Sequence, residues 1–561
     1  MLSNEEKIIL EIISQTPSTK AEFNNIRRQT ANKLKIMHPS NRQLIQAYQN
    51  LIKKKRIKIN KNLENLMKKA DIRTLSGIAV VTSLTKAYHC PGNCVYCPEE
   101  AKMPKSYLAS EPAAARALGL QFDPYKQMSS RIKTLEKNGH PTDKIEYIIK
   151  GGTWNTYPLK YQYWFILESF RACNEMKKIK NKNFKTKTKN NINKYSLSDL
   201  QIELEKAQRK NEKAKHRIIG LTLETRPDAI TPETIYHMRK QGCTRIELGL
   251  QAPDDKILKL IKRGHTVQQF KEALFLLRQA GFKVDLHFMP DLPGSTAKHD
   301  VEMYKLIFSD PELKPDMIKI YPCTVIKSAE LYNWYISGKY KPYNEKKLFE
   351  ALIEMKINTP RYCRISRLIR DIPNPDIEAG NAITNLREEL KKEMHKRKLK
   401  CNCLRCREIG HNQNFKFKTS DLKLFIDKYN TIGGEEYFLS FEDKKRNVVL
   451  AFLRLRLPNR DKNYYASKIF KLQPEIKDSA FIRELHTYGQ LISLNQKINK
   501  TKKRNEIQHT GLGKSLVAEA EKIVKKNNYP KIAVISGVGV RDYYRKLGYK
   551  KTKTYMIKKI R

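Results

Sequence analysis

Residues 78–97 read IAVVTSLTKAYHCPGNCVYC, a β-rich apolar run followed at once by a loop with three cysteines. Cys90, Cys94 and Cys97 have the spacing C-x3-C-x2-C. Three thiolates so close together can bind three irons of a 4Fe–4S cluster and leave the fourth iron open to a small chelating molecule. A structural zinc site is the alternative, but zinc prefers a fourth protein ligand and no further cysteine follows before Cys173.

Short β-rich runs alternate with helical stretches beyond this loop. The runs are Ile78–Leu84, Ile145–Lys150, Arg217–Leu223, Arg245–Leu250, Lys283–Met289 and Asp316–Tyr321, with amphipathic segments such as Val267–Ala280 between them. Repeated strand–helix units at this spacing predict a parallel α/β barrel or a doubly wound sheet. The tract 176–194, rich in Lys and Asn and without an acidic residue, predicts a flexible basic insertion.

The residues before the first strand predict a small, basic, helical module over 1–75. Leu44, Ile45, Tyr48, Leu51 and Ile52 form an apolar helical stripe that leads into the run KKKR. The whole chain of 561 residues holds 110 Lys and Arg against 58 Asp and Glu, a net charge of +52. Compositional bias explains part of this excess, and the remainder favours a polyanionic partner such as nucleic acid.

Cysteine usage and the N-terminus indicate a cytosolic protein. No apolar run is long enough to span a membrane, and Glu5 and Glu6 stand where a signal peptide carries positive charge. In a reducing compartment, clustered cysteines indicate metal rather than disulfides. A second cluster, Cys401, Cys403 and Cys406, therefore predicts a metal-stapled linker over 356–420.

Residues 421–561 predict a final α+β or α/β domain. Its expected elements are strands at Val448–Leu457, Phe481–Tyr488 and Lys531–Ser536 and a helix at Gly513–Lys525. The sequence QHTGLG at 508–513 precedes that helix. Backbone N–H groups of such a loop, together with the helix N-terminus, can bind an anionic group such as a pyrophosphate.

The first cysteine loop resembles that of the radical S-adenosylmethionine enzymes, in which three cysteines bind the cluster and the open iron chelates S-adenosylmethionine. The resemblance implies a partial (β/α)6 barrel over 76–355, with the site at the C-terminal ends of the strands. It also implies reductive cleavage that yields a 5′-deoxyadenosyl radical. Gly151 and Gly152 resemble the glycine-rich segment that approaches the methionyl amine in that family.

The 508–513 loop resembles the acyl-CoA loop, Q/R-x-x-G-x-G/A, of the Gcn5-related N-acetyltransferases. That resemblance implies an α/β acetyltransferase domain that binds acetyl-CoA. The residues implicated are Gln508, Gly511, Leu512, Gly513 and Lys514 in the loop and helix start, Glu484, Leu485, His486 and Thr487 in the preceding strand, and Tyr543 and Tyr544 near the CoA sulfur.

Taken together, the chain resembles the family of Elongator catalytic subunits over nearly all of its length. Matching stretches include CPGNCVYCPEE, GHPTDKIEYIIKGGTW, GLTLETRPD, GCTRIELGLQ, FKVDLHFMPDLPG, RDIPNPDI, IRELHTYG and QHTGLGKSLVAEAE. This resemblance implies transfer of the acetyl methyl carbon of acetyl-CoA to carbon 5 of the wobble uridine of tRNA. Hydrolysis of the thioester would then leave a carboxymethyl group.

The family resemblance also assigns individual residues. Cys90, Cys94 and Cys97 match the cluster ligands, Lys144 matches a barrel lysine that contacts acetyl-CoA, and Tyr544 matches an acetyltransferase contact. The linker zinc of the family implies Cys401, Cys403 and Cys406 as ligands, with His411 and Cys323 both open as the fourth. The implied partners are an electron donor and an anticodon stem-loop. The phosphates of the stem-loop would be contacted in part by Arg364, Arg367 and Arg370. A homodimer and accessory subunits both stay open.

A protein lysine acetyltransferase with a structural iron–sulfur domain is the alternative from another class. The net charge of +52 disfavours a basic protein tail as substrate, because like charges repel. The intact three-cysteine motif favours radical chemistry. The same motif and the unbroken acyl-CoA loop also disfavour a passive tRNA-binding protein.

Overall fold

The computed structural model describes residues 2–68, 77–176, 192–412, 422–460, 464–488 and 511–560. Most of the predicted basic insertion, residues 177–191, lies outside these ranges. No helix within them is both long and apolar enough to cross a bilayer.

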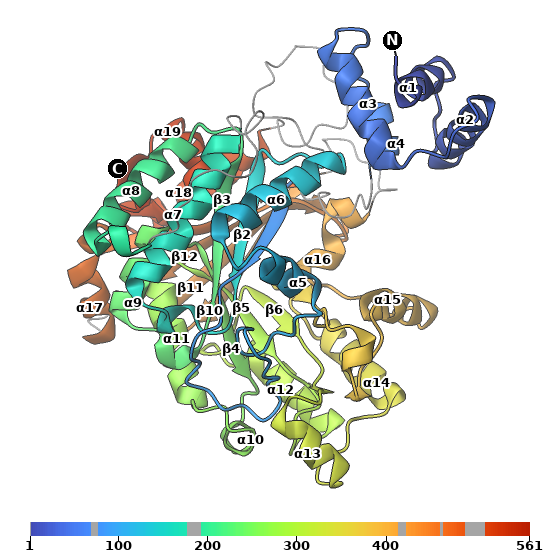
Figure 1. The fold of residues 1–561 in the computed structure, drawn as a ribbon. Coiled ribbons are helices and arrows are strands. Elements are labelled where there is room, and N and C mark those ends of the chain that lie inside the picture. The colour runs from blue at the N-terminus through green and yellow to red at the C-terminus, as the bar shows by residue number, and fades with distance from the viewer. Residues whose placement is uncertain are drawn as a thin grey trace.

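Four N-terminal helices form a small unit that stands apart from the two sheets (Figure 1). They are α1 (Asn4–Ser14), α2 (Lys20–Lys33), α3 (Asn41–Lys53) and α4 (Lys61–Met67). Ser3, Thr19, Ser40 and Asn60 cap the four helices, since each side chain accepts a hydrogen bond from a backbone N–H of the first turn. The apolar stripe of α3 packs into a core of this unit's own.

The central unit is a seven-stranded parallel sheet in the order β1-β2-β3-β4-β5-β6-β8. Its strands are β1 (Ala79–Leu84), β2 (Lys144–Lys150), β3 (Arg217–Thr225), β4 (Arg245–Gln251), β5 (Lys283–Phe288), β6 (Met317–Ile320) and β8 (Arg364–Arg367). A doubly wound sheet reverses its strand order at a switch point, whereas these strands follow chain order throughout. The structure therefore confirms the partial barrel.

Helices connect the strands of this sheet (Figure 1). They are α5 (Pro112–Gly119), α6 (Pro124–Lys137), α7 (Leu159–Glu175), α8 (Leu197–Asn211), α9 (Pro232–Gln241), α10 (Asp255–Leu260), α11 (Val267–Gln279), α12 (Ala297–Ser309), α13 (Glu330–Ile336) and α14 (Glu345–Ile357). Burial alternates along β2: Ile145, Tyr147 and Ile149 are buried, while the residues between them are partly exposed. Glu146, Ile148 and Lys150 thus face the inner side of the barrel.

The barrel sheet continues into the segment predicted as the linker, because β8 pairs in parallel with β6. A short antiparallel pair, β7 (Thr324–Val325) and β9 (Ala379–Gly380), and the helices α15 (Leu386–Lys396) and α16 (Leu404–Arg407) complete this region. The sequence of β8, RISR, lacks the apolar run that signals a strand, so the expected six strands did not include it.

The C-terminal domain is a second seven-stranded sheet in the order β10-β11-β12-β13-β14-β16-β15. Its elements are β10 (Leu422–Thr431), β11 (Gly434–Asp443), β12 (Val449–Pro458), α17 (Tyr464–Leu472), β13 (Ser479–Thr487), α18 (Leu512–Lys526), β14 (Lys531–Val534), α19 (Arg541–Arg545), β15 (Lys550–Thr552) and β16 (Tyr555–Lys559). All pairs are antiparallel except β13 with β14. Helix α18 packs against β12 and β13, as expected for an α/β acetyltransferase domain.

A buried ionic network joins the two sheets. Arg483 on β13 donates to Asp316, which precedes β6, at 2.7 Å, and Arg278 on α11 donates to Glu436 on β11 at 2.9 Å. Arg454 and Arg456 of β12 belong to the same network, and all six side chains are at most 1% exposed. Charges buried this completely need fixed partners, so the network sets the orientation of the C-terminal domain on the barrel.

Candidate active site

A single cavity of about 920 Å³ lies between the barrel sheet and the C-terminal domain. Cys90 and Cys97 of the first cysteine loop line it, and so do Glu484, His486 and Tyr544 of the C-terminal domain. The iron–sulfur loop and the acetyl-CoA strand, which the sequence predicts separately, therefore open into one space.

The first cysteine loop is held in a cationic setting. The Arg263 guanidinium donates to the Cys94 thiol at 3.5 Å, and the Cys90 thiol lies 3.8 Å from the Thr153 hydroxyl. Burial raises the pKa of the Cys94 thiol, but Arg263 outweighs this effect and brings the pKa below its usual value. Three thiols beside a fixed positive charge suit an anionic iron–sulfur cluster.

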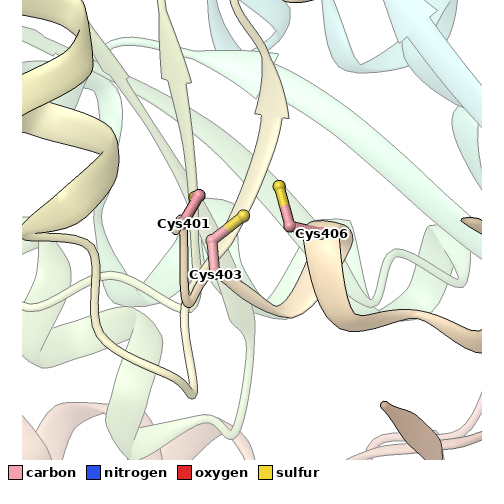
Figure 2. A group of neighbouring side chains, drawn as sticks. All are labelled: Cys401, Cys403 and Cys406. Carbon is pink, nitrogen blue, oxygen red and sulfur yellow. The ribbon is translucent and has the colours of Figure 1, made fainter. Parts of the chain in front are cut away.

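The second cysteine cluster has a different geometry. The thiols of Cys401, Cys403 and Cys406 all lie within 4.8 Å of one another (Figure 2). Cys90, Cys94 and Cys97 form no such tight group. Convergence on one point suits a single tetrahedral ion, whereas a 4Fe–4S cluster takes each thiol on a different iron.

Neither candidate for a fourth zinc ligand joins the Cys401, Cys403 and Cys406 group. Nε2 of His411 lies 3.7 Å from a carboxylate oxygen of Glu408, and His411 lines the cavity. The buried Cys323 donates its backbone N–H to the carbonyl of Pro290. Sequence reasoning passed over Cys363, whose carbonyl accepts from the Leu404 N–H at 2.8 Å and whose thiol pKa is raised by burial and by Cys403.

Gly151 and Gly152 follow β2 in backbone conformations that favour glycine, with φ of +136° and +91°. A Cβ at Gly151 would stand 1.8 Å from the Thr85 hydroxyl oxygen, so only glycine fits. Gly152 lines the cavity, where its backbone is accessible. Its predicted approach to the methionyl amine stays a prediction.

Lys144 begins β2 and is not among the residues that line the cavity. Burial lowers the pKa of its ammonium group. Its predicted contact with acetyl-CoA stays a prediction. Lys150, at the carboxyl end of the same strand, is the lysine of β2 that lies in the cavity.

Glu484 on β13 is bound on both of its oxygens. Lys283, the first residue of β5, donates to one at 3.0 Å, and Arg454 donates to the other at 2.9 Å. Burial alone would raise the pKa of Glu484, but these two cations lower it to about 2. Glu484 is therefore ionised at neutral pH and is unsuited to act as a base. Its ion pair with Lys283 links β13 of the C-terminal domain to β5 of the barrel.

The remaining acetyltransferase residues lie close together. The rings of His486 and Phe452 stack with centroids 5.8 Å apart, and burial lowers the pKa of His486. A Cβ at Gly513 would meet the Tyr543 hydroxyl at 2.8 Å and the Thr487 hydroxyl at 3.6 Å, so glycine permits this approach. Tyr544 is buried edge-on against Tyr543 at 5.3 Å.

The N-terminus of helix α18 lies at the protein surface. Gly511 caps it with φ of +83°, Leu512 and Gly513 form the first turn, and Gly511 and Lys514 are exposed to solvent. The first turn holds no acidic residue. Its free N–H groups can therefore receive a phosphate. Gln508 lies outside the described residues.

Sequence reasoning missed a charged cluster on the inner face of the barrel. Lys150 and Lys319 both contact the carboxylate of Glu247, and Nε2 of His287 lies 3.5 Å from the same group. Glu224 lies 3.5 Å from Lys150. Alternation of charged with apolar residues, as in IELG and MIKI, is the signal that could have revealed it.

Burial governs the protonation of this cluster. It lowers the pKa of Lys150 and of His287 well below their usual values, so the imidazole is neutral at physiological pH. Burial opposes ionisation of Glu224 as well, but the positive charges of Lys150 and Lys319 outweigh it and lower the pKa of Glu224 to about 2. Glu224 thus stays ionised inside the cavity, whereas His287 is neutral.

The chain matches two family models. Residues 84–307 match the Radical SAM superfamily, and residues 315–396 match the Radical_SAM C-terminal domain. The first match contains the cysteine loop and β2 to β5, and the second contains β6 and β8.

Similar proteins cover most of the chain. A tRNA uridine(34) acetyltransferase of Methanocaldococcus infernus is 41% identical over 94% of this chain and 92% of its own length. An Elongator complex protein 3 of Schizosaccharomyces pombe is 36% identical over 88% of each chain. A solved structure, the archaeal Methanocaldococcus infernus Elp3 with an N-terminal deletion, covers 86% of this chain and 99% of its own, at 40% identity and a TM-score of 0.69.

Proposed function

The chain belongs to the family of tRNA uridine(34) acetyltransferases and Elongator complex proteins 3, and we propose on that premise that it modifies the wobble uridine of tRNA with acetyl-CoA as carbon donor. The product is a carboxymethyl group at carbon 5 of the uracil, formed from the acetyl methyl carbon after hydrolysis of the thioester. We place the reaction in the cytoplasm.

The shared cavity is the observation that carries this proposal. Radical chemistry on an acetyl group requires the radical source and the thioester to meet, since a carbon radical does not survive diffusion through water. That requirement is met if both bind in this cavity, because its lining includes Cys90 and Cys97 from the cysteine loop and His486 and Tyr544 from the C-terminal domain.

The first cysteine loop fits a 4Fe–4S cluster. Cys90, Cys94 and Cys97 would each bind one iron, Arg263 would balance the negative charge, and the Gly152 backbone would accept the methionine part of S-adenosylmethionine. When bound, the cluster and S-adenosylmethionine would supply a 5′-deoxyadenosyl radical able to take a hydrogen atom from the acetyl methyl group. The proposal therefore requires an external electron donor.

The C-terminal domain would hold acetyl-CoA. Gly511 and Lys514 at the start of α18 face solvent, where the pyrophosphate can be bound, and Leu485 and His486 line the cavity into which the thioester would extend. The phenol of Tyr544 is buried at the cavity, and burial raises its pKa, so it stays a neutral donor. From there it can donate to the CoA sulfur as the thioester is hydrolysed.

The linker cysteines would hold zinc away from the chemistry. Convergence of the Cys401, Cys403 and Cys406 thiols suits a closed structural site. This zinc would fasten α16 beside β8, which carries Arg364 and Arg367 into the cavity lining.

The basic N-terminal unit and the cavity rim would bind the anticodon stem-loop through phosphates. Arg364 is already bound by Glu408 at 2.6 Å, and Arg370 is bound by Glu111 at 3.0 Å. Arg367 also has a partner, Asp371, but its side chain lines the cavity and is 41% exposed. Of these three arginines, Arg367 is thus the best placed to contact RNA.

An anaerobic turnover assay tests the proposed function. Reconstituted enzyme, reductant, S-adenosylmethionine, acetyl-CoA and unmodified tRNA are incubated, and the digested tRNA is examined by nucleoside mass spectrometry. We expect carboxymethyluridine that is absent without S-adenosylmethionine and absent with Cys94→Ala. The variant Cys173→Ala, which changes a buried cysteine outside both clusters, should retain activity. Carboxymethyluridine formed without S-adenosylmethionine would contradict the radical mechanism.

A further inference from the structure

The guanidinium of Arg226 lies against the first cysteine loop. Arg226 directly follows β3, and a single 3-10 turn brings the carboxylate of Asp228 back to it. Asp228 accepts from Nε of Arg226 at 2.9 Å and from one terminal nitrogen, Nη2, at 3.0 Å. These two hydrogen bonds fix the plane of the guanidinium, so the direction of its other terminal nitrogen, Nη1, is fixed as well.

Nη1 of Arg226 is a buried donor that has no acceptor among the residues the structure describes. The residue is 4% exposed and lines the cavity. Arg263, which also lies beside the cysteine loop, differs in this respect, because its three nitrogens donate to His265, Cys94 and Gly249. A buried N–H without an acceptor is unfavourable by itself, so Nη1 indicates that a bound group supplies the acceptor.

Two glycines leave room for this guanidinium. A Cβ at Gly92 would stand 2.1 Å from Nη1 of Arg226 and 3.6 Å from Sγ of Cys94. A Cβ at Gly264 would stand 3.2 Å from Nη2. Nη1 and the Cys94 sulfur therefore lie close to the same point on the loop that would hold the cluster.

The position of Nη1 favours sulfur as its acceptor. A 4Fe–4S cluster held by the cysteine loop would bring anionic sulfur to this loop, and a charged N–H donates readily to an anionic acceptor. The carboxylate of S-adenosylmethionine is the other anion that the cavity would receive. The methionine part is assigned to Gly152, and the Cβ position there has only the Lys105 carbonyl within 4 Å, so Arg226 does not adjoin it.

We propose that Nη1 of Arg226 donates a hydrogen bond to a sulfur atom of the iron–sulfur cluster and thereby raises the reduction potential of the cluster. When an external donor loses one electron, the cluster gains one negative charge, and a fixed N–H of a cation stabilises that charge. Arg226 and Cys94 are at most 6% exposed, so little water screens this interaction. The inference rests on the proposed function, and it adds a residue that makes the cluster easier to reduce.

A redox titration of the reconstituted cluster tests this assignment without S-adenosylmethionine or tRNA. The EPR signal of the reduced cluster gives the midpoint potential in wild type and in Arg226→Met, a substitution that removes every N–H donor of the side chain. We expect the equilibrium constant for one-electron reduction to fall about tenfold or more in the variant, which lowers the midpoint by about 59 mV or more.

Gly92→Ala displaces the guanidinium without removing its charge. The new Cβ would collide with Nη1, and the backbone of Gly92 does not have a positive φ, so the loop itself can accept alanine. We expect the midpoint of Gly92→Ala to fall as well, because the hydrogen bond is lost while the charge remains nearby.

Matched controls separate this effect from loss of the fold. Arg209→Met makes the same substitution at an exposed arginine of α8 and should keep the wild-type midpoint. Iron content reports whether each variant binds its cluster. Should Arg226→Met bind no cluster, Gly92→Ala decides the question, since it retains Arg226.

The outcomes are distinct. A wild-type midpoint in Arg226→Met overturns the proposal. A lower midpoint in Arg226→Met with a wild-type midpoint in Gly92→Ala also overturns it, because the charge alone would then explain the effect. Unchanged midpoints with weaker binding of S-adenosylmethionine in equilibrium dialysis would assign Nη1 to that ligand instead. Lower midpoints in both variants of an enzyme that forms no carboxymethyluridine would contradict the proposed function and leave the role of Arg226 intact.

Discussion

At the scale of single residues, Glu484 can be identified from its sequence motif, but its role follows from contacts that only the structure shows. Its motif, RELHTYG, resembles an acetyl-contact strand. Its partner Lys283 lies 201 positions away in the sequence, so no local pattern reveals the ion pair. The structure makes Glu484 a buried anion that connects β13 to the start of β5.

Replacing Glu484 by Gln should make stability less dependent on pH in acid. The native carboxyl has a pKa of about 2, below its usual value, so its ionisation stabilises the native state above the unfolded pKa. That contribution is lost as the pH falls through the native pKa. We expect Glu484→Gln to lower the free energy of unfolding at pH 7 by on the order of 2 kcal/mol.

Thermal unfolding of both proteins from pH 7 down to pH 2 measures this effect. The difference between wild type and Glu484→Gln should be constant near neutrality and should shrink below about pH 4.5. Glu330→Gln, at an exposed ion pair with Lys262, serves as the control and should change little. A difference that stays constant down to pH 2 would contradict the assignment of the shifted carboxyl.

Gly151 places a residue-scale requirement on the turn after β2. With φ of +136° and Thr85 in the way of any Cβ, Gly151→Ala should cost about 2 kcal/mol or more of stability. Because Gly152 follows directly in the cavity lining, binding of S-adenosylmethionine should weaken as well. Gly119→Ala on α5 is the matched control, since nothing lies near its Cβ position and the substitution favours a helix.

Differential scanning calorimetry and equilibrium dialysis with S-adenosylmethionine measure the two effects. The control should bind S-adenosylmethionine like wild type and unfold at the same temperature or slightly higher. If Gly151→Ala matched the control in both measurements, the contact with Thr85 would not affect stability, and the turn after β2 would not form part of the S-adenosylmethionine site.

At the scale of elements, hydrophobic pattern was sufficient for most of the barrel and insufficient at its last strand. The six strands from β1 to β6 carry apolar runs, and parallel strands covered by helices favour such runs. β8, with the sequence RISR, carries two arginines because Arg364 is paired with Glu408 and Arg367 opens onto the cavity. These arginines belong to the functional site, so β8 lacks the apolar pattern by which a strand is recognised in a sequence.

The loop and short helix around α16 should depend on zinc for their structure. Cys403→Ser should abolish stoichiometric zinc and lower the melting temperature, because a structural metal stabilises the folded loop directly. Cys323→Ser should retain zinc, since the buried Cys323 lies outside the converging thiols. Metal analysis of the purified variants and thermal unfolding with and without a chelator measure both expectations. Loss of zinc from Cys323→Ser alone would show that the ligand set differs from this geometry.

At the scale of the whole molecule, the sequence predicted the parts and the structure supplies their relation. Motifs around Cys90 and around His486 indicate two cofactor regions, but no pattern in the sequence predicts that these two regions line one cavity. That information is held in the interface, where Asp316 and Glu436 meet arginines from α11, β12 and β13. Buried arginines are poor signals in a sequence, because they cannot be told from the many exposed basic residues of this chain.

The interface network should therefore control how the two domains act together. Asp316→Asn keeps the shape of the side chain but removes one of the two buried carboxylates that Arg278 and Arg483 share, which leaves only Glu436 against these arginines, so we expect a loss of about 3–5 kcal/mol of stability. At temperatures where the variant is still folded, acetyl-CoA binding should change little, because its residues belong to the C-terminal domain. Formation of carboxymethyluridine should fall much further, since it requires His486 and Tyr544 to stay aligned with Cys90 across the cavity.

Calorimetry, acetyl-CoA titration and nucleoside mass spectrometry measure the three quantities, with Lys262→Met at an exposed ion pair as the control. Equal losses of acetyl-CoA binding and of modification would show that the variant disturbs the C-terminal domain itself rather than its orientation on the barrel.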